Sequence, residues 1–141
     1  MTQITYHLAE IRNRVAHAAL RSGRDASAVT IVAVSKAQSV AKIAAAHSAG
    51  QRDFGESYVQ EALPKIAPLQ GTDAVWHFIG HLQGNKTRVV AERFHWAHTV
   101  DREKIAARLN DQRPHFAPPL NVLIQVNQAL ETQKAGVAPS E

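Results

Sequence analysis

Hydrophobic positions at the start of the chain recur every three or four residues. Over residues 3–22, apolar side chains fall at i, i+3 and i+4, and polar side chains fill the positions between them. This spacing places the apolar side chains on one face of an α-helix. Gly23 follows directly and is typical of the residue just past a helix end. We therefore predict an amphipathic helix over residues 3–22.

The pattern then changes to a continuous run of small and β-branched apolar residues over positions 30–36. Runs without polar alternation are typical of strands that are buried on both faces of a sheet. The run ends at Lys36, so this strand carries an amine at its carboxyl end. Ser39 then fits the N-cap of a second helix that reaches about Gly50.

Extended and helical patterns alternate over the rest of the chain. The predicted strands are residues 52–55, 75–80, 95–100 and 120–126, and the predicted helices are residues 56–63, 85–94 and 101–110. Pro64 and Pro68 are expected to break or kink the helix that starts at Glu56. Asp101 is the expected N-cap of the helix that follows it.

The predicted strands end near residues 36, 55, 80, 100 and 127, at intervals of about 19 to 27 residues. This is the period of βα units, in which helices join parallel strands. Five such units make either a complete open sheet of the flavodoxin type or the first five units of a (β/α)8 barrel. A closed barrel needs about 200 residues or more. Because residues 139–141 read as the start of another helix, we expect a chain that stops partway through its fold.

Composition narrows the class of protein. The chain has 141 residues, of which 45% are hydrophobic and 20% charged, as in ordinary globular proteins. It contains no cysteine, which excludes disulfides and thiolate metal sites. No linker or repeat divides it, so we expect one domain over residues 1–141. No apolar stretch is long enough for a membrane span, and the first residues lack a secretory signal, so we expect a cytoplasmic protein.

The formal net charge is +4, which raises the question of an anionic partner. The basic residues are dispersed rather than clustered, and aromatic residues make up only 6% of the chain. Nucleic-acid surfaces normally combine a basic patch with aromatic stacking platforms. A basic nucleic-acid-binding module is therefore a disfavoured alternative.

Lys36 is the first candidate for chemistry. Open α/β sheets and barrels hold their ligands at the carboxyl ends of the strands. A partly desolvated amine in that position loses some of its charge and becomes a nucleophile for carbonyl groups, as a Schiff base requires. The alternative is a strand-end lysine that points into water, and this segment alone leaves both possibilities open.

Two later turns add polar groups at neighbouring strand ends. Residues 54–58, Phe-Gly-Glu-Ser-Tyr, place Ser57 where backbone amides also face a ligand, although a simple capped turn explains them too. Residues 76–86 contain His77 and, at the start of a helix, Asn85 and Lys86. His77 also fits a hydrogen-bonded core histidine. The eight histidines lack the spacing of a metal site, and no dinucleotide or phosphate-binding loop motif is present.

Four segments in order resemble the pyridoxal phosphate homeostasis protein family: residues 32–36, Val-Ala-Val-Ser-Lys, and residues 54–61, 76–86 and 121–127. The resemblance covers essentially the whole chain. It implies a barrel like the N-terminal domain of alanine racemase, which binds pyridoxal 5′-phosphate (PLP) as a Schiff base on Lys36. Ser57, His77 and Asn85 are the other implied cofactor contacts. The implied role is non-catalytic vitamin B6 homeostasis, in which PLP is buffered and delivered to apo-enzymes.

The chain departs from the family pattern at several positions. Ser57 stands where members commonly have asparagine, and Gln38 and Ser39 stand where they often have lysine and proline. Members also continue beyond Glu141 into strands that supply a phosphate-binding cup and an arginine. We therefore expect this chain to bind PLP more weakly than a complete member, and to be marginally stable or to self-associate through two unpaired sheet edges. A full-length member is expected to be a monomer.

An enzyme of related fold is the main alternative function. An amino-acid racemase would need a second acid–base group on the opposite face of the cofactor from Lys36. In alanine racemase that group comes from a second domain, for which this chain has no counterpart. The resemblance therefore favours a PLP carrier over a racemase.

Overall fold

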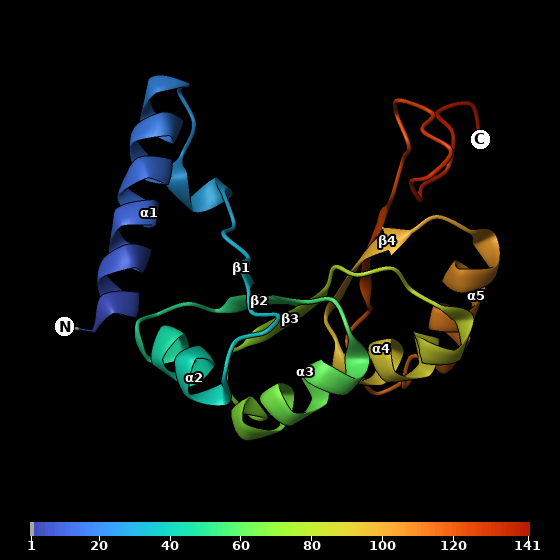
Figure 1. Ribbon diagram of the computed structural model, residues 1–141, viewed down its shortest axis with the longest axis horizontal. Coiled ribbons are helices and arrows are strands. Elements are labelled where there is room, and N and C mark those ends of the chain that lie inside the picture. Colours follow the sequence, from blue (N-terminus) through green and yellow to red (C-terminus); the bar gives the residue numbers. More distant parts are fainter. Residues whose placement is uncertain (1) are drawn as a thin grey trace.

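The computed structural model describes residues 2–141 as a five-stranded parallel sheet with most of its helices along one face (Figure 1). The helices are α1 (Gln3–Arg21), α2 (Val40–Ser48), α3 (Val59–Ile66), α4 (Thr87–Arg93) and α5 (Glu103–Gln112). The strands are β1 (Ala33–Val34), β2 (Asp53–Glu56), β3 (Val75–Phe78), β4 (Trp96–Val100) and β5 (Asn121–Ile124). Short 3-10 turns cover Ala26–Ala28, Ala67–Leu69 and Gly84–Lys86.

The strands follow one another across the sheet in the order β1-β2-β3-β4-β5, and every neighbouring pair is parallel. An open flavodoxin-type sheet has the order 2-1-3-4-5, with its first strand inside the sheet. A sequential order is instead that of consecutive units of a (β/α)8 barrel. The barrel interpretation of the βα period is therefore confirmed, and the flavodoxin alternative is wrong.

The hydrophobic core lies between the central strands and the helices. Phe54, Trp76 and Phe78 on β2 and β3 are each exposed by no more than 2%. The rings of Phe54 and Trp76 pack with centroids 5.4 Å apart, and Phe78 meets Phe94 edge to face at 5.5 Å. The remaining core side chains come mainly from α3, α4 and α5, including Val59, Ala62, Val90, Ala91, Ile105 and Leu109.

The two outermost strands are much less covered. β1 has only two residues, and Val34 is 52% exposed. All four residues of β5 are exposed. The prediction of a strand over residues 30–36 that is buried on both faces is therefore wrong, because only Ala33 and Val34 form β1 and neither is fully buried. The two expected open sheet edges are found along β1 and β5, although Val126, just beyond β5, forms an isolated parallel bridge with Val137.

Several predicted helix boundaries are confirmed. Ser39 caps α2, where its hydroxyl accepts a hydrogen bond from the Lys42 amide at 3.3 Å. α1 ends at Arg21, and Gly23 then takes a positive φ of 68°. This left-handed conformation favours glycine because glycine has no Cβ.

Other predicted boundaries are wrong. The helix expected to begin at Glu56 begins at Val59, because β2 extends through Glu56. Pro64 lies inside α3, which continues to Ile66 and is followed by the 3-10 turn that contains Pro68. Arg102, not Asp101, is the N-cap of α5, and Asp101 instead accepts a hydrogen bond from the Gly136 amide at 3.1 Å.

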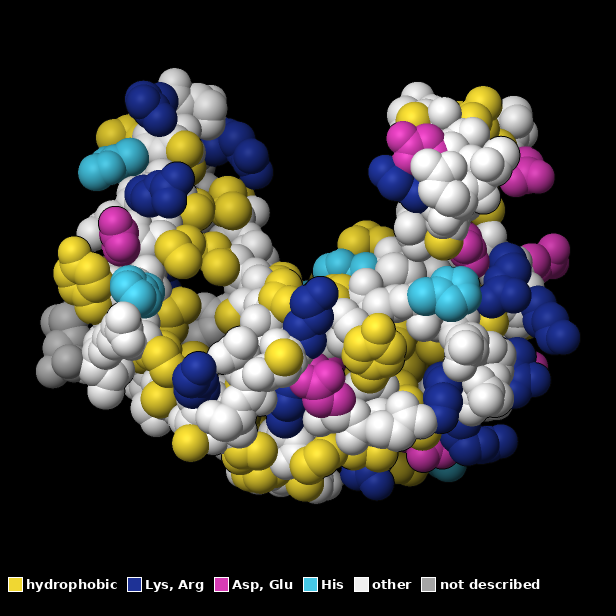
Figure 2. Space-filling model, in the orientation of Figure 1, with side chains coloured by type: hydrophobic (Ala, Val, Ile, Leu, Met, Phe, Trp, Pro, Cys, Tyr) yellow, Lys and Arg dark blue, Asp and Glu magenta, His cyan; other side chains and the backbone are white. Residues whose placement is uncertain are grey.

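The molecule has a concave side. α1 rises beside one end of the sheet and the segment after β5 rises beside the other, while α2, α3 and α4 lie beneath the strands (Figure 1). The space-filling view shows the hollow between these two arms (Figure 2). Over residues 2–141, the helices are too short or too polar to cross a membrane.

Candidate functional site

A cleft of about 380 Å³ opens at the carboxyl ends of β1, β2 and β3. Its polar walls come from the turns that follow these strands: Lys36 after β1, Ser57 after β2, and His81 and Lys86 after β3. This is the edge at which barrels of parallel strands place their ligands. A larger hollow of about 820 Å³ is lined by α1 alone and receives no residue from a strand end.

Lys36 presents a free amine at this cleft. Its side chain is exposed, and among residues 2–141 its Nζ has no hydrogen-bond or ion-pair partner. Of the two possibilities that the strand pattern leaves open, the structure therefore shows an exposed lysine and not a desolvated one. The amine is instead accessible and unpaired, which a nucleophile for a small carbonyl ligand requires.

The turns after β2 and β3 pack closely enough to fix the wall opposite Lys36. A Cβ atom added to Gly80 would lie 2.1 Å from the carbonyl oxygen of Ser57, so only glycine allows this approach. The hydroxyl of Thr99 on β4 donates to the carbonyl oxygen of Gly80 at 2.5 Å. Ser57 is thus held in the cleft by backbone packing.

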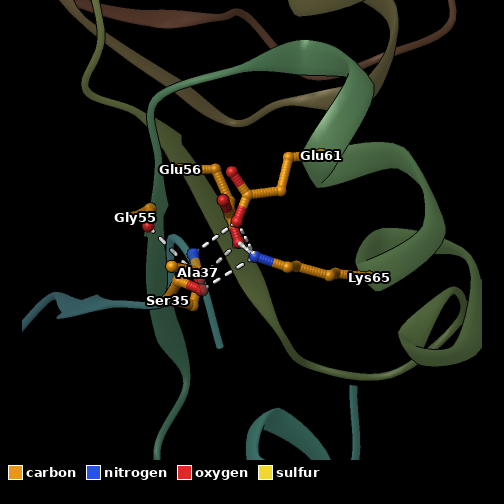
Figure 3. Close-up of polar contacts among 6 residues, drawn as sticks. All are labelled: Ser35, Ala37, Gly55, Glu56, Glu61 and Lys65. Atoms are coloured by element: carbon orange, nitrogen blue, oxygen red, sulfur yellow. Dashed lines mark hydrogen bonds and ion pairs between the residues drawn. The ribbon is translucent and has the colours of Figure 1, made fainter. Parts of the chain in front are cut away.

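A largely buried ionic network contacts the residues on both sides of Lys36, in the turn Ser35–Gln38 that we call the lysine turn (Figure 3). Lys65 on α3 donates from Nζ to Glu56 Oε1 at 2.7 Å, to Glu61 Oε1 at 2.8 Å and to the Ser35 carbonyl oxygen at 2.8 Å. Glu56 is fully buried, and its Oε1 also accepts from the Ser35 hydroxyl at 2.8 Å. Glu61 Oε1 further accepts a hydrogen bond from the Ala37 amide.

The electrostatics of this network keep Lys65 charged. Burial by itself would lower the pKa of Lys65, but the hydrogen bonds and negative charges of Glu56 and Glu61 outweigh it and raise that pKa above 10.5. The hydrogen bond from Lys65 in turn lowers the pKa of Glu61 below 4.5, assisted by the Ala37 amide. Lys65 is therefore a protonated structural lysine and Lys36 is the accessible one.

His77 lies outside the lining of the cleft. It is 4% exposed, and its ring nitrogens lie 2.8 Å from Asp53 Oδ1 and 2.8 Å from His98 Nε2. Its ring also stacks on Trp96 with centroids 5.5 Å apart. This is the arrangement of a hydrogen-bonded buried histidine, and a contact between His77 and a cofactor stays a prediction.

Asn85 is also absent from the lining. It is exposed within the 3-10 turn Gly84–Lys86, and its neighbour Lys86 faces the cleft in its place. Of the four site residues predicted from the sequence, the structure thus brings Lys36 and Ser57 together and leaves His77 and Asn85 apart from them. Within residues 2–141, no group of three or more His, Asp or Glu side chains is arranged to hold a metal ion.

Lys65 was not predicted from the sequence, although a signal for it exists. Val59, Ala62 and Ile66 form the buried stripe of α3, and Lys65 falls on the same stripe. A lysine at such a position is rarely buried unless it is paired. Glu61, four residues earlier on the helix, is its visible partner in the sequence.

Residues 6–141 match the alanine racemase N-terminal domain family. The pyridoxal phosphate homeostasis protein of Escherichia coli (strain K12) is 51% identical over 144 residues, which cover 100% of this chain and 62% of that protein. The protein of the same name from Pseudomonas aeruginosa is 50% identical over 141 residues, which cover 100% of this chain and 61% of that protein.

Solved structures of a related protein share the fold of this chain. PipY of Synechococcus elongatus PCC7942 without PLP superposes with a TM-score of 0.84 at 37% identity, covering 98% of this chain and 60% of PipY. The PipY structure with PLP bound superposes with a TM-score of 0.77 and covers 59% of PipY. The chain therefore spans about three fifths of the length of these relatives.

Proposed function

The chain belongs to the family of alanine racemase N-terminal domains, and we propose that it binds PLP through a Schiff base on Lys36. The observation that carries the proposal is the accessible Lys36 amine, which has no partner among residues 2–141 and lies in a cleft at the carboxyl ends of the strands. PipY, which shares this fold, has been solved with PLP bound.

The residues of the cleft fit a ligand of this chemistry. A volume of about 380 Å³ lies within the range of small-molecule sites, about 300 to 1,000 Å³. Phe78 and Val59 give the cleft apolar walls for an aromatic ring, while Lys86 and His81 provide donors for an anionic group. Ser57 adds a hydroxyl on the wall held against Gly80.

PLP supplies an aldehyde that condenses reversibly with amines. The Lys36 nitrogen adds to the aldehyde carbon, a carbon–nitrogen double bond forms, and the carbonyl oxygen leaves as water. Hydrolysis reverses these steps and releases PLP intact. A reversible bond of this kind suits a protein that stores a reactive aldehyde and gives it up again.

We further propose that the chain acts as a PLP carrier in vitamin B6 homeostasis and not as an enzyme. The curated relatives are named pyridoxal phosphate homeostasis proteins, which supports this role. Apo-enzymes that need PLP are the proposed recipients, and the cytoplasm is the proposed compartment. A racemase-like activity is tested directly by chiral chromatography of alanine incubated with the protein and PLP, and we expect no racemisation.

Lys36→Ala tests the cofactor site, and Lys42→Ala is the matched control. Lys42 is an exposed lysine on the neighbouring helix α2, where it contacts Gln38. With PLP, the wild type and Lys42→Ala are expected to show a visible absorption band, and borohydride is expected to fix a PLP adduct on the Lys36 peptide. We expect Lys36→Ala to lose the band and the adduct.

The proposal fails if Lys36→Ala binds and absorbs like the wild type. It also fails if borohydride labels Lys86 or Lys65 in place of Lys36. Mass spectrometry of the digested protein distinguishes these lysines, because each lies in a different peptide.

A further inference from the structure

We propose that Glu61 and Lys65 are positioning residues that hold the backbone on both sides of Lys36 and so direct its amine into the cleft. The inference rests on the proposed role of Lys36. It assigns a task to a network that does not itself line the cleft.

The backbone before Lys36 is held at Ser35. The Ser35 amide donates to the Gly55 carbonyl oxygen at 2.9 Å, which continues the pairing of β1 with β2. The Ser35 carbonyl oxygen accepts from Lys65, and its hydroxyl donates to Glu56 (Figure 3). Ser35 is 3% exposed, so these bonds are shielded from water.

The backbone after Lys36 is held at Ala37. Ala37 has a positive φ of 60°, a conformation that residues with a Cβ atom rarely adopt. The Gln38 amide donates to the Ser35 carbonyl oxygen at 3.0 Å and closes a tight turn, in which Lys36 and Ala37 are the central residues. The Glu61 carboxylate accepts the Ala37 amide and so stabilises the unfavourable half of this turn.

Both side chains that hold this backbone come from α3. Glu61 and Lys65 lie one helical turn apart and pair with each other at 2.8 Å. The same helix begins at Val59, which lines the cleft beside Tyr58. The lysine turn and the opposite wall of the cleft are therefore tied to one rigid element, which fixes the amine relative to the space it faces.

Positioning matters because condensation with an aldehyde depends on the approach of two groups. Holding the amine near the bound aldehyde raises their effective concentration, so the bond between nitrogen and carbon forms, with loss of water, at lower free PLP. A loosened turn leaves the amine chemically unchanged but lets the Lys36 side chain adopt many orientations. The expected result is weaker adduct formation without loss of the fold.

Glu61→Ala tests this role, and Glu61→Gln is the conservative variant that keeps an acceptor for the Ala37 amide. Glu61 is chosen over Lys65 because its side chain is 33% exposed, so its replacement leaves no large buried cavity. Asp73→Ala is the matched control, since Asp73 is a carboxylate that pairs with His47 and Arg52 outside the cleft.

Three measurements separate positioning from general stability. Amide hydrogen exchange at Ala37 is expected to be at least about tenfold faster in Glu61→Ala and near wild type in the other two variants. The PLP concentration at which the absorption band of the adduct reaches half its maximum is expected to rise by about tenfold in Glu61→Ala only. All three variants are expected to keep a single cooperative melting transition, which would show that the fold is retained.

Each outcome has a separate meaning. Wild-type exchange at Ala37 in Glu61→Ala would overturn the inference, because Glu61 would then not hold the turn. Fast exchange with an unchanged adduct titration would overturn it as well, because the turn would not position the amine. A wild-type protein that forms no adduct on Lys36 would instead remove the proposed function, while the exchange data still decide whether Glu61 fixes the turn.

Discussion

The centre and the edges of the sheet use similar residues but bury them very differently. Phe54 and Trp76 on the central strands are 1% and 2% exposed, whereas Val34 on β1 and Ile124 on β5 are 52% and 69% exposed. All four are large apolar side chains on parallel strands. The difference comes from their neighbours, since a central strand is paired on both sides and covered by helices, and an edge strand is not.

The centre and the edge of the sheet therefore have different roles in the molecule. The centre supplies the stability of the fold through a continuous core. Lys36 follows the edge strand β1, so its surroundings are set by a few hydrogen bonds and not by close packing. An accessible amine at an edge needs a dedicated holding network, and α3 provides one.

Trp76→Ala is expected to have the largest effect on stability. Trp76 is 2% exposed and packs on Phe54, so its removal should lower the free energy of unfolding by about 3 to 5 kcal/mol. Ile124→Ala, at the exposed edge, is expected to change it by less than about 0.5 kcal/mol. Urea denaturation measures both, and equal losses in the two variants would contradict the contrast between centre and edge.

A smaller loss of folding stability is expected on acidification, and it should come from histidines near the central strands. The Trp76 amide donates to His95 Nδ1 at 2.9 Å, which requires that nitrogen to be unprotonated. Desolvation, with the positive charge of Arg113, lowers the pKa of His95 below 6.5, and desolvation together with His77 lowers the pKa of His98. The folded state therefore binds fewer protons than the unfolded state below about pH 6.5, so stability should fall as the pH falls.

Urea denaturation between about pH 7.5 and about pH 5.5 measures this dependence. The double variant His95→Gln, His98→Gln is expected to flatten it. An unchanged slope in that variant would show that other groups set the pH response. β1 and β5 contain no titratable residue, so the edges should not contribute to it.

The smallest change in folding stability, but a visible change in association, is expected from Ile124→Lys. β5 is an exposed edge with apolar side chains, which is a template for pairing with another chain. A lysine there should reduce concentration-dependent self-association and change the free energy of unfolding by less than about 0.5 kcal/mol. Size-exclusion chromatography with light scattering measures the mass, and identical association in the wild type and the variant would argue against pairing through β5.

The alternation of strands and helices could be predicted from the sequence because each element carries its own period. The extents of the outer strands could not, because the apolar run at residues 30–36 looks the same whether or not another strand covers it. The strand order decided between a barrel and a flavodoxin-type sheet, and no local pattern encodes that order.

Part of the candidate site could also be predicted. Lys36 and Ser57 were predicted because each follows a strand directly, and parallel strands bring their carboxyl ends together. The task of Lys65 could not be predicted, because it depends on Glu56 and Ser35, which belong to two different strand ends. The surroundings of His77 were equally hidden, since Asp53 and His98 reach it from the two flanking strands.

The sequential strand order also bears on how the chain folds during synthesis. Each strand pairs with the one made just before it, so the sheet can grow one unit at a time as the polypeptide leaves the ribosome. Nascent units need not wait for a distant partner, because every loop to be closed is short. The hydrogen bond from Lys65 to Ser35 and the ion pair of Lys65 with Glu56 can therefore form before β4 and β5 have been made.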